Sequence, residues 1–269
     1  MTGHEPGGQV PVLMYHAVAD EPSAATRRLS VTPRALDEQV TFLAESGYTG
    51  MTFSELARAF ATGAPLPPRP VVFTFDDGYA DFAESAWPIL RRNDFPATVF
   101  VTTGWVADAG PDASGKPLGP MLTWAQVRSL AAAGVEIGAH SHSHPELDQC
   151  PAVDLADELH VGRTLLEDCI GAPVRAFAYP FGYSSPRVRL AVRAAGYRCA
   201  AAVANVWANP AGDLFRVPRL TIRRHTDAAE FATIMTGSER IFWTDRMLTT
   251  GWAAVRAARR ARKRVGRNG

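Results

Sequence analysis

Short apolar runs alternate along the chain with longer stretches in which apolar residues keep a helical spacing. The runs that we expect to form strands lie at residues 10–15, 71–75, 97–102, 135–139, 175–178, 198–203 and 217–222. Helical patterns fall between them, near residues 53–61, 80–92, 123–132, 153–169, 184–194 and 227–236. Strands that alternate with single helices are typical of βαβ units, so the pattern predicts an α/β protein with a parallel sheet, most simply closed into a barrel.

A further helix, after the first strand, has clear start and stop signals. Thr32 is a good N-cap, and Pro33 suits the first helical position because its missing N–H has no intrahelical partner there. Apolar residues follow at helical spacing until Gly47. We therefore expect a helix that begins at Pro33 and ends just before Gly47.

Length and composition fit one large α/β domain or two small ones. The chain has 269 residues, of which 46% are hydrophobic, so a sizeable core is expected. The segment 107–121 is rich in Gly, Pro and Asp and should form a loop over one barrel end. The N-terminus lacks the pattern of a signal peptide, and no apolar run reaches the ~18 residues of a membrane span, which predicts a cytoplasmic protein.

The C-terminal segment differs in charge from the rest of the chain. Residues 240–269 contain nine Lys and Arg residues and one Asp, a net charge of +8, whereas the whole chain carries +1. We therefore divide the chain into an α/β domain, 1–239, and a basic helical tail, 240–269. Leu248, Trp252 and Val255 fall on one helical face, beside a basic stripe that starts at Arg256.

Two interpretations of this tail remain open. Its first turn packs on the barrel and the rest is a solvated charged end, or the tail is an interfacial helix that holds the protein at the inner face of an anionic membrane. Nucleic acid is not expected as a partner, because the tail has no base-reading motif.

Polar residues follow several of the predicted strands. His16 follows the first, Asp76 and Asp77 follow 71–75, and three histidines at 140, 142 and 144 follow 135–139. The carboxyl ends of parallel barrel strands surround one mouth, where such folds carry their chemistry. The pattern therefore predicts a single active site built from these residues.

Adjacent carboxylates in a partly dry site repel each other, so either Asp76 or Asp77 should take up a proton or find a nearby cation. His140 and His144 would meet in space if residues 140–144 form a turn, which leaves His142 as the intervening residue. Two imidazoles with one carboxylate form a three-ligand site with an open position, as in catalytic zinc centres. We therefore expect a divalent metal, Zn²⁺ first, with Co²⁺ or Ni²⁺ as alternatives.

Three motifs resemble a known family: TFDDGY at residues 74–79, HSHSH at 140–144 followed by Pro, and YPFG at 179–182. In this order they are similar to the signature motifs of the polysaccharide deacetylases, the NodB homology domain or carbohydrate esterase family 4, over roughly residues 8–235. The resemblance implies a distorted (β/α)7 barrel in a single domain. It also implies that Asp77, His140 and His144 bind the metal, and that Asp76 is the general base.

The chain departs from that family's pattern at two places. The third motif usually begins with an Arg that braces the base, but Ala178 stands at that position, so Arg219 is the candidate to orient Asp76. The usual C-terminal strand ending in a catalytic His is missing. The segment PVLMYHAV resembles instead the start of the poly-N-acetylglucosamine deacetylases, whose motif order is circularly permuted. This resemblance implies that His16 is the catalytic acid, with His225 as the alternative.

These observations predict a metal-dependent N-deacetylase of N-acetylated amino sugars, with an N-acetylated carbohydrate as its partner. The substrate and the oxyanion would be contacted by residues after the strand ends and by the bracing arginine, namely Trp105, Tyr179, Pro180, Phe181 and Arg219. Trp105 and Phe181 are the candidates for a sugar platform, and a backbone N–H near Phe181 for the oxyanion. The alternatives are a hydrolase of a non-sugar amide or cyclic imide on the same fold, and a non-catalytic carbohydrate-binding protein.

Overall fold

A computed structural model of the chain describes residues 8–238 and Phe242. Eight strands of the described part form one curled sheet, in the order β7-β6-β5-β4-β3-β1-β8 with β2 paired to β3 off this path. The strand pairings are parallel. The strands are β1 (Val12–Tyr15), β2 (Thr49–Met51), β3 (Pro70–Phe75), β4 (Ala97–Val101), β5 (Glu136–Ala139), β6 (Ala176–Ala178), β7 (Cys199–Ala201) and β8 (Leu220–Thr221).

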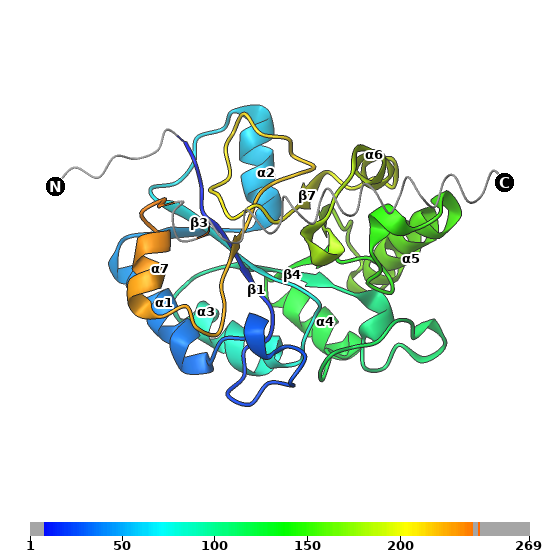
Figure 1. Cartoon of the computed structure of the whole chain (residues 1–269), viewed down its shortest axis with the longest axis horizontal. Helices are drawn as coiled ribbons and strands as arrows, with labels where there is room; N and C mark the ends of the chain where they lie inside the picture. The colour runs from blue at the N-terminus through cyan, green and yellow to red at the C-terminus, as the bar shows by residue number, and fades with distance from the viewer. Residues whose placement is uncertain (1–7, 239–241, 243–269) are drawn as a thin grey trace.

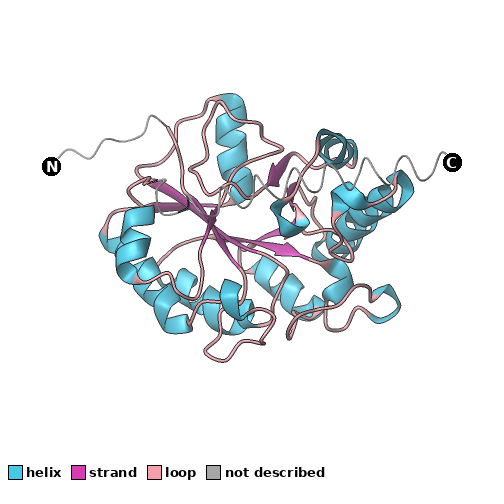
Figure 2. Ribbon diagram, in the orientation of Figure 1, coloured by secondary structure: helices cyan, strands magenta, loops and turns pink. Residues whose placement is uncertain are grey.

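Helices surround the outside of this sheet (Figures 1 and 2). They are α1 (Pro33–Glu45), α2 (Phe53–Thr62), α3 (Trp87–Arg92), α4 (Trp124–Ala132), α5 (Ala152–Ile170), α6 (Pro186–Ala194) and α7 (Ala228–Ile234). A π-helical segment, Phe82–Ala86, leads into α3. The predicted distorted (β/α)7 barrel is confirmed.

The first and last strands of the described chain, β1 and β8, pair with each other and close one side of the barrel. β1 pairs with β3 on one side and with β8 on the other, where Leu13 faces Leu220. Between β7 and β8, a parallel bridge joins Ala201 at the end of β7 to Val217, just before β8. Side chains from the first and last strands can therefore reach one common interior.

The first helix forms as its sequence predicts. The Thr32 hydroxyl accepts a hydrogen bond of 3.0 Å from the Ala35 amide, and Pro33 is the first helical residue. Leu36, Val40 and Leu43 are buried on its inner face. The helix ends at Glu45, and the left-handed Gly47 (φ 73°) then turns the chain toward β2.

β2 is the strand that the sequence pattern misses. It has only three residues, and only one of them, Met51, is both apolar and buried. Its register against β3, with Thr49 facing Pro70 and Met51 facing Val72, comes from pairing with a neighbouring strand rather than from an alternating pattern of its own.

Phe242 lies inside the predicted tail, yet it is 3% exposed and belongs to the same core cluster as Leu220 and Ile234. The rest of 240–269 lies outside the described residues, so its predicted helix and basic stripe remain predictions. Among the residues described, no helix is both long and apolar enough to cross a bilayer.

Candidate active site

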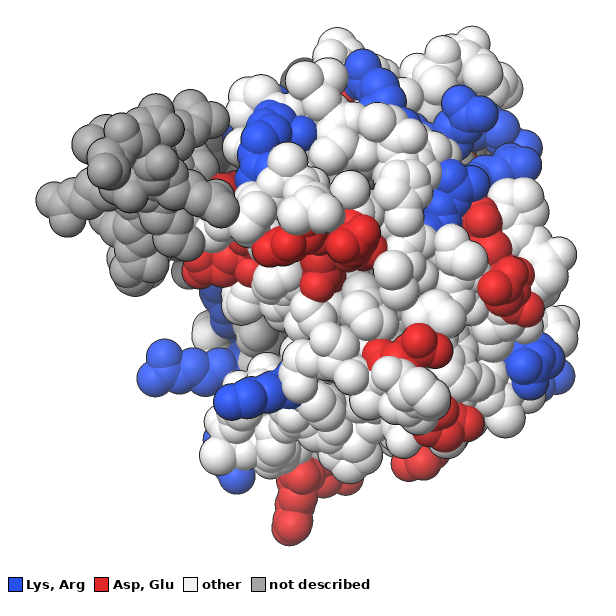
Figure 3. Space-filling model, turned by 90° about the vertical axis from the view of Figure 1, so that its right-hand side faces the viewer, with Lys and Arg blue, Asp and Glu red and all other residues white. Residues whose placement is uncertain are grey.

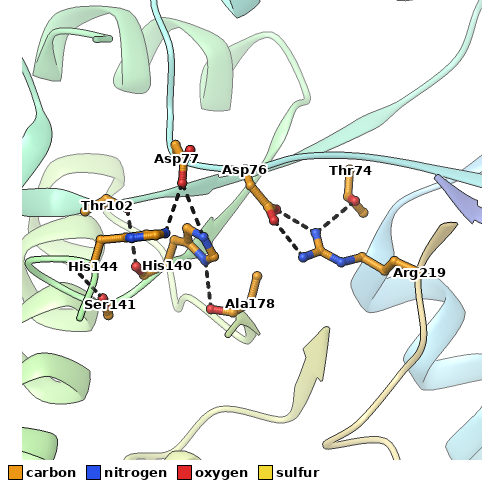
Figure 4. A network of polar contacts seen from close by, with 9 residues as sticks. All are labelled: Thr74, Asp76, Asp77, Thr102, His140, Ser141, His144, Ala178 and Arg219. Carbon is orange, nitrogen blue, oxygen red and sulfur yellow. Dashed lines mark hydrogen bonds and ion pairs between the residues drawn. The ribbon is translucent and has the colours of Figure 1, made fainter. Parts of the chain in front are cut away.

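The turn after β3 directs two adjacent carboxylates in different directions. Asp77 (φ 74°) and Gly78 (φ 87°) are both left-handed, and the Thr102 amide donates to the Asp77 carbonyl at 3.2 Å. A glycine is favoured at the second position because it adopts this conformation without strain. Figure 4 shows the result: the Asp77 side chain points to the histidines, and that of Asp76 points to Arg219.

The loop after β5 brings two histidines together. Ser141 (φ 63°) and His144 (φ 62°) both have left-handed backbones, and the His144 amide donates to the Ser141 hydroxyl at 3.0 Å. As a result the His140 and His144 rings lie 4.9 Å apart between centroids. His142 is not part of this pair, because its Nδ1 lies 2.9 Å from the Thr103 hydroxyl instead.

Asp77, His140 and His144 together fit a divalent cation. One donor atom from each lies within 4.8 Å of the others. The Nε2 atoms of His140 and His144 face Asp77 Oδ1 at 3.4 and 3.3 Å, yet this buried oxygen has no hydrogen-bond partner among the described residues.

The tautomer of His140 supports the same conclusion. Its Nδ1 lies 2.8 Å from the Ala178 carbonyl, an acceptor, so this nitrogen carries the proton (Figure 4). In the neutral imidazole, Nε2 then presents its lone pair on the side of Asp77, as a metal-ligating histidine does. Two imidazole nitrogens and one carboxylate oxygen are the ligand set of catalytic zinc sites.

Asp76 is held in a buried ion pair with Arg219. The guanidinium binds both carboxylate oxygens, at 2.6 and 2.7 Å, and also donates to the Thr74 hydroxyl at 3.1 Å. Arg219 is 0% exposed, so this bidentate pair lies within the barrel. Burial acts to raise the pKa of the Asp76 carboxyl, but the guanidinium lowers it, and the net result is a pKa below the ordinary value. Asp76 is therefore an ionised carboxylate in a fixed orientation.

His16 lies beside this pair. Tyr15 of β1 faces Phe75 of β3, and the Asp76 amide donates to the Tyr15 carbonyl at 3.0 Å, so the residues that follow the two strands are neighbours. Burial lowers the pKa of His16, and the opposing charges of the aspartates only partly offset this. His225, the alternative acid, is exposed on the segment after β8.

Phe181 is the aromatic residue that the site exposes. It has a left-handed backbone (φ 59°), its side chain is 53% exposed, and its ring lies 4.7 Å from that of His144. Tyr183 stacks on it at 6.3 Å. The Trp105 ring also contacts His144, at 4.8 Å between ring centroids, but Trp105 is only 5% exposed. It therefore packs behind the His144 ring and offers little surface to a sugar.

Tyr179 and Pro180 are buried beneath the site. The Tyr179 side chain is 0% exposed, and its hydroxyl donates to the Phe215 carbonyl at 2.8 Å. Pro180 is buried within the same turn as Phe181. Both residues are therefore buried supports of the turn that carries Phe181, and neither offers its side chain to a substrate.

Two contributors were not found from the sequence. Ala178, where the family usually has an arginine, supplies its backbone carbonyl to His140. Glu158 of α5 binds the histidine loop through backbone amides. Every residue has a backbone carbonyl, so the residue type at position 178 does not indicate a contact with His140. A glutamate in a helix is usually expected to be solvent-exposed. The sequence therefore did not reveal either contact.

Comparison with known proteins agrees with this geometry. The polysaccharide deacetylase family matches residues 63–200, just over half of the chain. The chain belongs to this family. The family match includes Asp76, Asp77 and both outer histidines, but neither His16 nor Arg219.

Three individual relatives match from 42% to 84% of this family member. The poly-β-1,6-N-acetyl-D-glucosamine N-deacetylase of Escherichia coli is 38% identical over 141 residues, which are 49% of this chain and only 20% of that protein. The chitooligosaccharide deacetylase of Bradyrhizobium is 31% identical over 116 residues, 42% of this chain and 47% of the relative. The solved structure of a Streptococcus pyogenes deacetylase in complex with acetate superimposes with a TM-score of 0.75 at 25% identity, over 84% of this chain and 98% of that one.

Proposed function

We propose that this polysaccharide deacetylase family member is a metal-dependent hydrolase that removes N-acetyl groups from N-acetylated amino sugars. The observation that carries the proposal is the convergence of Asp77, His140 and His144 beside an ionised, bidentately held Asp76. The names of the related deacetylases support the same substrate class.

Asp77, His140 and His144 would hold the metal, which we propose to be Zn²⁺, with Co²⁺ or Ni²⁺ as alternatives. A metal in this position supplies Lewis-acid chemistry, since it polarises the acetyl carbonyl and lowers the pKa of water toward neutrality.

Asp76 is the proposed general base. Its carboxylate takes a proton from the attacking water, and the bidentate contact with Arg219 keeps it ionised and oriented. His16, next to Asp76 at the end of β1, donates a proton to the departing amine, which is a poor leaving group until it is protonated. The amide C–N bond breaks, and the products are acetate and a free amine.

Phe181 is the proposed contact for the sugar and for the developing oxyanion. Its exposed ring stands next to the ligand His144, where an apolar sugar face can stack on it. Its backbone N–H is the proposed donor to the oxyanion.

Acetate release tests the proposal. The metal-loaded protein is incubated with chitooligosaccharides, with β-1,6-linked N-acetylglucosamine oligomers, and with a panel of small amides and cyclic imides. Acetate from either sugar supports the deacetylase function. Hydrolysis of the non-sugar panel alone would move the activity to another amide class. No hydrolysis of any substrate by protein with bound metal would contradict the proposal.

We also propose that the tail from residue 240 holds the catalytic domain against an anionic membrane surface. The face in Figure 3 carries both acidic and basic side chains, with an acidic cluster near its middle, whereas the tail concentrates a charge of +8. Basic residues are attracted to anionic lipid by ~1 kcal/mol each near the surface.

Liposome co-sedimentation tests this second proposal. The full chain should pellet with anionic vesicles at low salt and be released at high salt, while a chain that ends at Glu239 should stay in the supernatant. Equal pelleting of the two chains would leave the tail as a solvated end.

A further inference from the structure

The histidine loop, residues 140–144, has a strained backbone conformation at two residues. Ser141 and His144 are not glycines, yet both have φ values near 60°. Such a conformation is strained for a residue with a Cβ and persists only when its surroundings enforce it. The loop shape also directs His144 at Asp77, so whatever enforces it controls the metal ligands.

Glu158 of α5 binds this loop through both of its carboxylate oxygens. Its Oε2 accepts hydrogen bonds from the backbone amides of His142 at 2.9 Å and Ser143 at 2.8 Å. Its Oε1 accepts a short hydrogen bond from the Ser143 hydroxyl. Three donors from two consecutive residues therefore meet one charged acceptor, and charge-assisted hydrogen bonds of this kind are roughly twice as strong as neutral ones.

The opposite side of the loop rests on the chain after β4. The Thr103 and Gly104 amides donate to the carbonyls of Ser141 and His142, at 3.4 and 2.7 Å. On the α5 side, Gly162 lies so close that an added Cβ would sit 3.2 Å from the Ser141 carbonyl carbon and oxygen. The loop is therefore clamped between two elements, with Glu158 binding its amides and the 103–104 amides binding its carbonyls.

From this clamp we infer that Glu158 is a positioning residue for the metal site, an inference that rests on the metal-binding role proposed above. It binds no metal itself. It keeps the 141–144 backbone in the strained conformation that brings His144 Nε2 to Asp77 Oδ1. Outer contacts that orient ligands in this way are typically worth 10–100-fold in metal affinity.

Metal affinity of the full-length protein measures this role independently of turnover. Metal-free Glu158→Ala should bind Zn²⁺ about 10–100-fold more weakly than the parent in a chelator competition. Its Co²⁺ form should show an altered visible absorption spectrum, because the geometry of the ligands changes. Asp157→Asn is the matched control: Asp157 is the preceding residue on α5 and is exposed, so its affinity and spectrum should equal those of the parent.

Two milder variants keep the test decisive if Glu158→Ala does not fold. In Glu158→Gln the amide oxygen still accepts from the two backbone amides, but the charge is lost and an NH2 donor replaces the oxygen that accepts from the Ser143 hydroxyl, so a loss of affinity smaller than that of Glu158→Ala is expected. Ser143→Ala removes one of the three donors and should also weaken binding by a few fold. Parent-like affinity and an unchanged Co²⁺ spectrum in the folded variants would overturn the inference.

This outcome is separable from that of the proposed function. If the Glu158 variants lose metal affinity while the parent releases no acetate from any sugar, the positioning role stands and the deacetylase proposal fails. If the parent releases acetate but the Glu158 variants bind metal as the parent does, the deacetylase proposal stands and the positioning role fails.

Discussion

Asp76 and Asp77 are adjacent and chemically identical, but their surroundings give them different properties. Asp77 faces two imidazole nitrogens and keeps an oxygen without a hydrogen bond, whereas Asp76 is saturated by a guanidinium. The left-handed turn at Asp77 and Gly78 separates the two side chains. Two adjacent carboxylates thus have the surroundings that their proposed roles require, Asp77 as a metal ligand and Asp76 as the general base.

Substitution should separate the two roles. Asp77→Ala, His140→Ala and His144→Ala should each lose the metal, because each removes one of three ligands. Asp76→Asn should keep the metal but lose turnover by about 10²–10⁴-fold, the usual worth of general acid–base catalysis. Metal content after desalting and acetate release are the two measurements. Full acetate release by Asp76→Asn with normal metal content would refute the base assignment.

Arg219→Met should destabilise the protein strongly. It leaves the Asp76 carboxylate buried without a partner, and breaking a buried pair in this way costs about 3–5 kcal/mol. The double variant Asp76→Asn/Arg219→Met should recover much of this loss, because neither charge remains. Urea unfolding of the metal-free proteins at neutral pH gives the free energies of unfolding. A single variant within ~1 kcal/mol of the parent would show that the pair does not stabilise the fold.

His16→Ala should spare metal binding and lower turnover by about 10²–10⁴-fold, since it removes the proposed proton donor. His225→Ala is the matched control, because His225 is exposed and lies on the segment after β8, the strand that pairs with β1. Steady-state kinetics on both variants decide between them. Loss of turnover in His225→Ala alone would transfer the acid role to His225.

Helices and strands whose ends are marked by their own residues could be predicted from the sequence. Strands and contacts that depend on residues far away in the chain could not. Thr32, Pro33 and Gly47 mark the ends of α1 without help from the rest of the fold. β2 exists because residues 70–72 of β3 lie before the part that pairs with β4 and can pair with another strand. Arg219 meets Asp76 across 143 residues of chain. Motif spacing indicated that His140 and His144 meet, but the contacts that hold their loop depend on α5 and the chain after β4, which no local pattern reports.

The cap of α1 gives a prediction at this scale. Thr32→Ala removes the acceptor for the Ala35 amide and should cost about 1 kcal/mol of stability, the typical worth of an N-cap. Thr164→Ala, an exposed threonine inside α5, is the control and should be neutral or slightly stabilising because alanine favours helix. Urea unfolding compares the two. Equal stability of both variants would mean that the cap contributes nothing.

The whole molecule brings four segments together at one mouth. The proposed metal ligands follow β3 and β5, while Asp76 contacts the carbonyl of Tyr15 in β1 and the side chain of Arg219, the residue before β8. A metal held by Asp77, His140 and His144 would join the loop after β3 to the loop after β5, so its binding should stabilise the folded state as well as supply chemistry.

Metal removal measures that coupling. At a free metal concentration 100 times its Kd, binding to the folded state alone adds about 2.7 kcal/mol to the free energy of unfolding. The melting temperature should therefore rise when Zn²⁺ is added and fall with a chelator. In Asp77→Ala the melting temperature should not respond to either addition. A response in this variant equal to that of the parent would place the stabilising metal elsewhere.

The distance along the chain between Asp76 and Arg219 has a consequence for synthesis. Both aspartates and both ligand histidines leave the ribosome well before Arg219, which follows Asp76 by 143 residues. Until it arrives, Asp76 has no guanidinium, and a carboxylate without a partner must take up a proton or stay in water. The nascent barrel therefore cannot close over an ionised Asp76 until its last strand is made. During translation, the proposed metal ligands are therefore all made before the proposed base gains its guanidinium partner.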